Sequence, residues 1–148
     1  MSFDIRVQRQ LATPPEVAFH HWIDAEERAA WYCGDNDGWV VEAATDLRVG
    51  GTHRIAWGPS PAHMWREEGT FDVVEPPHRL AYTSRHIPPE DEGPGGEVHV
   101  TVTFEANAGG TLLTLVETGY PSAEVRDMVE KEFLPTGLDA YERTLPAA

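Results

Sequence analysis

The sequence lacks the features that would place a protein in a membrane or outside the cell. No apolar run is long enough to cross a bilayer, and the first residues carry neither the basic start nor the apolar core of a signal peptide. The single cysteine, Cys33, cannot form an internal disulfide, which agrees with a reducing compartment. We expect it to be a small, half-buried apolar residue. These absences predict a cytoplasmic protein without membrane insertion.

Basic residues are also scarce. The chain has 11 Lys and Arg against 25 Asp and Glu, which gives a formal net charge of −14. A charge of this sign repels phosphate backbones and anionic membrane surfaces, and the few basic residues are scattered rather than clustered. We therefore expect no nucleic-acid partner, and we attribute the acidity to solubility.

Motifs for metal, nucleotide or covalent chemistry are missing as well. Of the seven histidines, His20 and His21 are adjacent and would diverge on a helix, and the other five show no spacing typical of zinc ligands. The sequence contains no nucleophile elbow, dinucleotide fingerprint or kinase motif. We therefore predict no metal site and no cofactor.

The clearest pattern in the chain is an amphipathic helix near its C-terminus, from Ser122 to Leu145. Leu134, Leu138 and Tyr141 recur with helical spacing, so one face of this helix is apolar. Pro135 interrupts the pattern and predicts a kink, because proline cannot donate a helical hydrogen bond.

Short alternating segments fill most of the chain before this helix. Alternation of apolar and polar residues predicts half-buried strands at 3–11, 39–44, 52–57, 64–74, 79–84, 97–105 and 111–119. Thr13 with Glu16 reads as a capping box for a first short helix, and Asp24 begins a second one that ends near Gly34.

This order predicts an α+β fold in a single domain, residues 1–148. We expect a curved antiparallel sheet of about seven strands wrapped around the long C-terminal helix, with two short helices after the first strand. The stretch Arg85 to Gly96, rich in Pro, Gly and acidic residues, is expected to be an irregular loop or a lid.

Several short motifs, in this order, resemble the SRPBCC superfamily of START-like, helix-grip proteins. Within it, the chain is similar to the branch named after the C-terminal domain of a co-chaperone that activates a heat-shock ATPase. The motifs are Thr13–Val17, Trp31, Asp46–Gly51, Gly69–Leu80, Val102–Glu105 and Gly109–Thr114. The resemblance implies a deep cavity between sheet and helix, in a superfamily that includes carriers, cyclases and chaperone regulators.

The last helix departs from the pattern of that family. The family usually has Gly-Trp where this chain has Gly137-Leu138, and Pro135 lies just before it. A smaller side chain beside a kink is expected to enlarge or reshape the cavity there.

The side chains expected to face this cavity are largely apolar and aromatic. Five tryptophans are more than a plain core needs, although filling the core is the alternative explanation. Flat aromatic walls suit a bulky apolar or aromatic ligand. The predicted ligand-binding residues are Trp39, His53, Ile55, Trp57, Trp65, Phe71, Tyr82, Val100, Val102, Met128 and Phe133.

Two carboxylates, Glu67 and Glu117, share this inward parity. A buried acid with a raised pKa can act as a general acid or base, so these are the candidate catalytic residues. Against catalysis, a bulge near Gly69 would turn Glu67 outward, and Glu117 lies close to a strand end that solvent reaches.

We therefore predict that the chain binds a small, largely apolar molecule in the cavity, with His53, Tyr82 and Glu67 fixing its orientation, and we favour binding over catalysis. One alternative is a cyclase or dehydratase that uses a cavity carboxylate. The other is a chaperone-regulating interaction module that uses the acidic surface, whose binding would weaken with added salt. A homodimer is a further candidate assembly.

Overall fold

The computed structural model describes residues 3–32, 38–89 and 95–146. The sheet is built from β1 (Phe3–Leu11), β2 (Val40–Thr45), β3 (Thr52–Ser60), β4 (His63–Glu75), β5 (Arg79–Ile87), β6 (Gly96–Asn107) and β7 (Gly110–Tyr120). The helices are α1 (Pro15–Ile23), α2 (Ala25–Tyr32), α3 (Ala123–Met128), a π-helical turn (Val129–Phe133) and α4 (Leu134–Thr144). The predicted α+β fold is confirmed, and β3 and β5 each extend three residues further than predicted.

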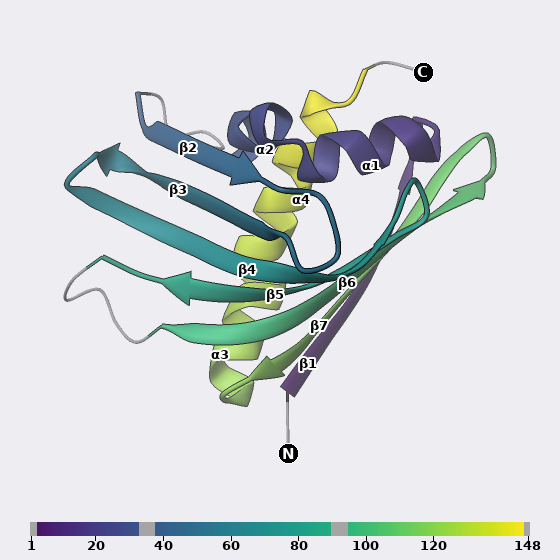
Figure 1. The fold of residues 1–148 in the computed structure, drawn as a ribbon. Helices are drawn as coiled ribbons and strands as arrows, with labels where there is room; N and C mark the ends of the chain where they lie inside the picture. The colour runs from purple at the N-terminus through teal and green to yellow at the C-terminus, as the bar shows by residue number, and fades with distance from the viewer. Residues whose placement is uncertain (1–2, 33–37, 90–94, 147–148) are drawn as a thin grey trace.

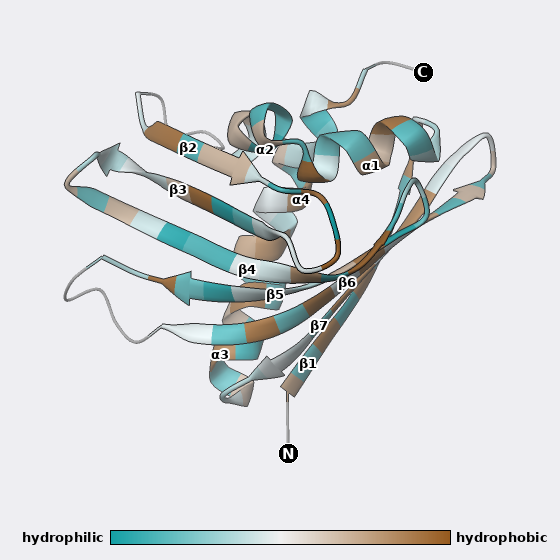
Figure 2. Cartoon of the chain, viewed as in Figure 1, coloured by the Kyte–Doolittle hydropathy of each residue, from teal (hydrophilic) through white to brown (hydrophobic). Residues whose placement is uncertain are grey.

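The seven strands form one antiparallel sheet in the order β1-β7-β6-β5-β4-β3-β2. Strands β2 to β7 follow one another as a meander, and β1 pairs with β7. The sheet curves around the C-terminal helical segment, while α1 and α2 cover one end of it (Figure 1). Hydrophobic and hydrophilic residues alternate along β6, β7 and β1 (Figure 2), as expected for strands with one buried face.

The hydrophobic core lies where α1, α2 and α4 cover the sheet. The Trp22 ring lies 5.1 Å from Tyr141, and Phe19 lies 5.5 Å from Phe104, both pairs in edge-to-face geometry. Leu138 is only 2% exposed. Because these side chains mesh, the deep cavity implied by the family resemblance does not extend through this half of the interface.

The C-terminal segment is helical from Ala123 to Thr144, as predicted, but not regular. The Ser122 side chain caps it by accepting a hydrogen bond from the Val125 N–H at 3.2 Å. In the π-helical turn, the Leu134 N–H bonds the Val129 carbonyl, five residues back. Pro135 follows directly, and its missing N–H and bulky ring explain why the helix widens there.

The two short helices begin differently from each other. Asp24 caps α2 as predicted, since its carboxylate accepts a hydrogen bond from the Glu27 N–H at 3.3 Å. The predicted capping box at Thr13 is wrong: Pro14 is the N-cap of α1, and the buried Thr13 hydroxyl has no hydrogen-bond partner among the described residues.

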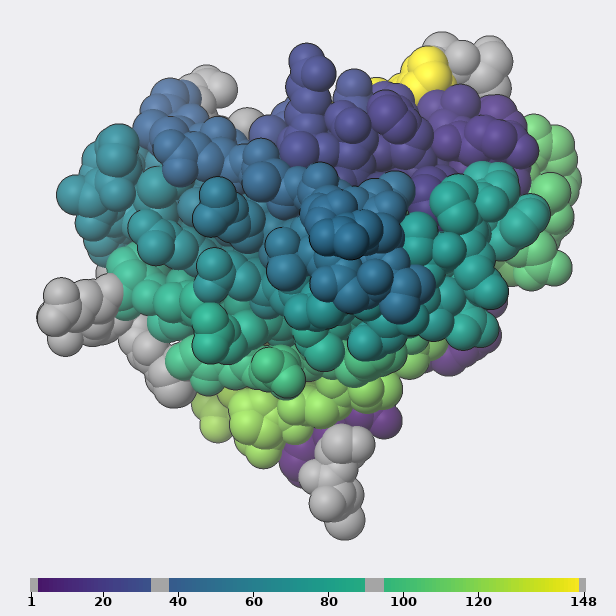
Figure 3. Space-filling view, viewed as in Figure 1, coloured from purple at the N-terminus to yellow at the C-terminus, as the bar shows by residue number. Residues whose placement is uncertain are grey.

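The outer face of the sheet is polar. Arg85 bonds Glu68 at 3.3 Å and His99 bonds Asp72 at 3.0 Å, each pair joining neighbouring or nearby strands. Figure 3 shows strand residues across the middle of this side, α1 and α2 along its upper edge, and the C-terminal helical segment only at the margins. In the ranges that the structure describes, no helix has the length and apolar character needed to cross a membrane.

The packing of α4 yields a stability prediction. Leu138→Ala would leave a cavity in the core and should lower the free energy of unfolding by about 2–5 kcal/mol. Met128→Ala, on the exposed side of the same helical segment, should change it by less than about 0.5 kcal/mol. Urea denaturation of both variants measures the difference, and equal losses would contradict the assignment of the buried face.

Candidate functional site

The candidate site lies on the concave face of the sheet, the side that faces α2 and the C-terminal helical segment. Strand register places Glu67 opposite Ile55 and His86, and places Val100 between Tyr82 and Glu117. Because cross-strand neighbours share a face, these side chains line one surface. We call the group Tyr32, Trp57, Glu67, Tyr82 and Glu117 the concave site.

A buried arginine anchors the site. Arg28, on α2, is 2% exposed, and its guanidinium bonds the Tyr32 hydroxyl and the His53 ring, both at 3.1 Å. It also lies 3.6 Å from the Glu67 carboxylate. Burial lowers the pKa of Arg28, but Tyr32, Tyr82 and Glu67 raise it by more, so the cation is retained. A buried charge needs partners of this kind, and here they come from both helix and sheet.

His53 is held as a neutral ring. Its Nε2 bonds the Thr83 carbonyl oxygen at 2.9 Å and must therefore carry the proton, so Nδ1 accepts the hydrogen bond from Arg28. Burial and the Arg28 charge lower the pKa of His53 to about 4. Gly69 makes room for this ring, because a Cβ there would lie 2.7 Å from Nε2 and would clash with the Thr83 carbonyl.

Glu67 points inward, as predicted. The Tyr32 hydroxyl donates a hydrogen bond to its carboxylate at 2.8 Å, and the Glu67 side chain keeps 24% exposure. The alternative of a bulge near Gly69 that turns Glu67 outward is wrong, because the register shift lies between Phe71 and Val73. The partly exposed Glu67 carboxylate thus lies beside the buried Arg28 guanidinium.

Glu117 is the second inward carboxyl. Burial raises its pKa, a hydrogen bond from the Tyr120 hydroxyl lowers it, and the Glu67 charge raises it, so that the resulting pKa is about 7. Within the described part of the chain, no Lys, Arg or His forms an ion pair with Glu117. This carboxyl therefore changes charge near neutral pH.

Half-buried aromatic rings occupy the open end of the concave face. Trp57 meets Tyr32 edge-to-face at 5.1 Å between ring centroids and lies 6.3 Å from His86. Trp39 stacks on Trp65 at 5.7 Å, with only 9° between the ring planes. These rings keep part of their surface uncovered, unlike the core aromatics.

The other predicted ligand-binding residues fall into two groups. The first group is fully or almost fully buried and forms the floor of the sheet: His53, Ile55, Phe71, Tyr82, Val100 and Val102. The second group is Met128 and Phe133, which are 42% and 60% exposed. This exposure is higher than expected of residues that close a cavity.

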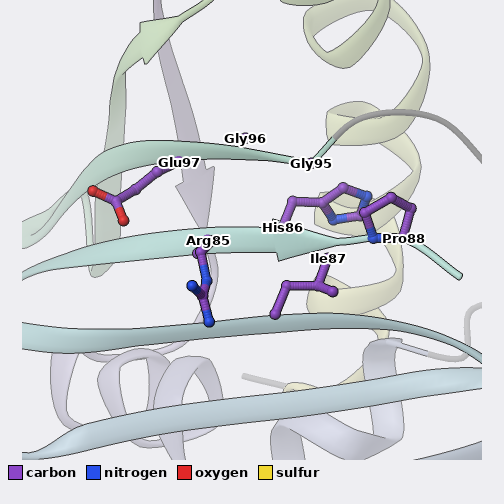
Figure 4. A pocket seen from close by; sticks show the side chains of 7 residues that line it. All are labelled: Arg85, His86, Ile87, Pro88, Gly95, Gly96 and Glu97. Atoms are coloured by element: carbon purple, nitrogen blue, oxygen red, sulfur yellow. The ribbon is translucent and has the colours of Figure 1, made fainter. Parts of the chain in front are cut away.

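The described residues line two hollows, and both lie at the margins of the sheet. One, of about 470 Å³, lies at the ends of β5 and β6, where His86 and Pro88 leave the strand on the opposite side from Arg85 and Ile87 (Figure 4). The other, of about 390 Å³, lies by the β2–β3 connection beside Arg54.

The expected irregular stretch from Arg85 to Gly96 is shorter than predicted, because β5 continues to Ile87 and β6 begins at Gly96. Residues 90–94, on which the lid hypothesis depends, lie outside the described residues, as does Cys33. Among the described residues, no group of three or more His, Cys, Asp or Glu is arranged to hold a metal ion.

Sequence reasoning missed three residues of the polar network. Arg28, Tyr32 and Tyr120 contact His53, Glu67 and Glu117 respectively. Arg28 and Tyr32 are four residues apart on one helix, and residues at this spacing share a helix face. The sequence therefore did indicate that these two side chains lie side by side. Nothing in the sequence indicated that this face meets the sheet.

The seven-stranded antiparallel sheet, the long C-terminal helical segment and the two short helices define a protein of the helix-grip class. The chain belongs to the family described as Activator of Hsp90 ATPase homolog 1-like protein, whose profile matches residues 12–145. The resemblance to this branch of the SRPBCC superfamily is thereby confirmed.

Solved structures with this fold share little sequence with the chain. A protein from Chromobacterium violaceum is 23% identical with a TM-score of 0.77, and the match covers 98% of each chain. One from Rhizobium leguminosarum is 20% identical with a TM-score of 0.80, covering 97% of this chain and 94% of that one. An AHSA1-like protein from Aeromonas hydrophila is 21% identical with a TM-score of 0.74, covering 96% and 91%. A comparison with curated proteins gave no match.

The raised pKa of Glu117 predicts a pH-dependent stability. An unfolded glutamate titrates near pH 4.3, so between there and about pH 7 the folded state binds more protons than the unfolded state. Stability from this group is therefore lost as the pH rises, by up to about 1.4 kcal/mol per pH unit.

Glu117→Gln should remove this loss and be more stable than the wild type at pH 8. Urea denaturation at pH 5, 6, 7 and 8 measures it, with the exposed Glu105→Gln as the matched control. Parallel pH profiles for wild type and Glu117→Gln would disprove the assignment.

Proposed function

We propose that the chain binds a small, largely apolar or aromatic molecule at the concave site, between the sheet and the C-terminal helical segment. The observation that carries this proposal is the set of half-buried rings, Trp57, Trp65 and Tyr32, beside partly open carboxyl groups. A core would bury such rings more completely, whereas a binding site leaves them a free face for a ligand.

The family supports this proposal at a coarser level. Proteins of this fold family commonly bind hydrophobic ligands.

The groups that orient a ligand differ from those expected from the sequence. His53 has both ring nitrogens engaged, so it positions Arg28 instead of contacting a guest. Tyr82 accepts a hydrogen bond from the Trp22 indole at 3.0 Å and keeps its own proton for donation. Glu67 and Glu117 retain acceptor capacity, so these three residues are the proposed polar contacts.

Binding can be tested with the uncharged dye Nile red and with native mass spectrometry of freshly purified protein. Trp57→Ala should weaken Nile red binding about tenfold or more, since it removes a contact worth about 1.5–3 kcal/mol. Leu47→Ala, at an exposed position outside the site, should leave the affinity unchanged. Equal affinities for both variants, or a wild-type protein that neither retains a small molecule nor binds the dye, would refute the proposal.

A second candidate function is acid/base catalysis, in the manner of a cyclase or dehydratase. The specific observation in its favour is Glu117, whose pKa of about 7 suits a general acid or base. For a retained molecule identified by mass spectrometry, Glu117→Gln or Glu67→Gln should abolish turnover while leaving affinity nearly intact. Affinity and turnover that fall together would count against catalysis.

A further inference from the structure

We infer that the molecule bound on the concave face is a flat aromatic ring system, and that its ring lies over Gly96, against the side chains of His86 and Trp57. This inference rests on the proposed function and narrows it to one shape of ligand and one place on the face. It follows from the strand register, from the space over a glycine and from the rings around that space.

Strand register places His86 and Gly96 on the concave face. Glu67, which points inward, is directly opposite His86 of β5, and His86 is directly opposite Gly96 of β6. Residues directly opposite each other in an antiparallel pair share a face of the sheet. A side chain at position 96 would therefore stand next to the His86 ring, on the side of the C-terminal helical segment.

The space that such a side chain would occupy is open. Among the described residues, no atom lies within 4 Å of a Cβ built on Gly96. The preceding glycine differs, because a Cβ on Gly95 would lie 2.5 Å from the His86 carbonyl oxygen. Gly95 thus allows the close approach of β5 and β6, whereas Gly96 leaves room above the strand.

This room belongs to the larger of the two hollows. His86, Pro88, Gly95 and Gly96 all line it, and its volume of about 470 Å³ lies within the range of about 300–1,000 Å³ typical of small-molecule pockets. Figure 4 shows the rings of His86 and Pro88 close together beside Gly95. The floor is therefore glycine backbone and the wall is formed by rings, which favours a flat guest.

Trp57 continues this wall. Its ring centroid lies 6.3 Å from that of His86, with 42° between the ring planes, and Trp57 is not part of the core cluster of the described residues. Aliphatic side chains such as Val102 and Leu113 are 0% exposed and lie in that core. A guest at the hollow therefore meets rings, and rings attract other rings in stacked or edge-to-face geometry.

The second hollow does not suit the same guest. Charged side chains line it, among them Asp46, Arg54 and Glu68. Its one aromatic ring, His53, is 1% exposed and has both nitrogens engaged in hydrogen bonds. A flat apolar molecule would find no accessible ring face there.

The shape of the ligand can be tested with 2-naphthol and decahydro-2-naphthol, measured by calorimetry at pH 7. Both have the same carbon skeleton and one hydroxyl, but only 2-naphthol is flat and aromatic. The wild-type protein should bind 2-naphthol about tenfold more tightly than the saturated alcohol. His86→Leu keeps an apolar side chain without a ring, so it should reduce this preference to about threefold or less.

The place of binding can be tested by filling the space over Gly96. Gly96→Leu should fold like the wild type, because its Cβ meets no described atom, and should weaken 2-naphthol binding about tenfold or more. Glu105→Leu adds the same side chain at an exposed position near the other end of β6 and should leave the affinity unchanged.

Equal affinities for 2-naphthol and its saturated analogue, or wild-type affinity for 2-naphthol in Gly96→Leu, would overturn the inference. If Nile red binding still depended on Trp57 in that case, the proposed apolar site would stand. A wild-type protein that binds neither 2-naphthol nor Nile red would defeat the proposed function and this inference together. If Gly96→Leu fails to fold, the ring preference of His86→Leu decides the matter.

Discussion

The structure of the site depends on one buried cation. Arg28 lies where α2 meets the sheet, and a guanidinium there would be strongly destabilising without partners. The fold supplies His53 from β3, Glu67 from β4 and Tyr32 from α2 itself. Because every partner needs a defined orientation, this network fixes how α2 sits against the strands, and with it the position of the aromatic rings.

The concave face consequently has one part in which the side chains are tightly packed and another in which they are partly exposed. Where α1 and α4 cover β6 and β7, rings such as Trp22 and Tyr141 interlock, and the space is filled. Towards the ends of β3 and β4, Trp57 and Trp65 keep part of their surface.

Sequence alone predicted the strands, the helices and the inward parity of Glu67 and Glu117, because two-residue and helical periodicities report directly on which face is buried. It did not predict the role of Arg28. A charged residue in a short helix ordinarily faces solvent, and only the tertiary arrangement brings this one against His53. The Thr13 cap failed for a related reason: local capping preference yielded to the placement of Pro14.

The two inward acids, Glu67 and Glu117, differ in how far the fold compensates their negative charge. Glu67 has a cation and a tyrosine hydroxyl, so its charge is satisfied by the fold. Glu117 has one hydroxyl, from Tyr120, and its pKa of about 7 means that ionising it is unfavourable in the folded protein. An acid whose charged form the fold disfavours is typical of functional sites, because perturbed pKa values concentrate there.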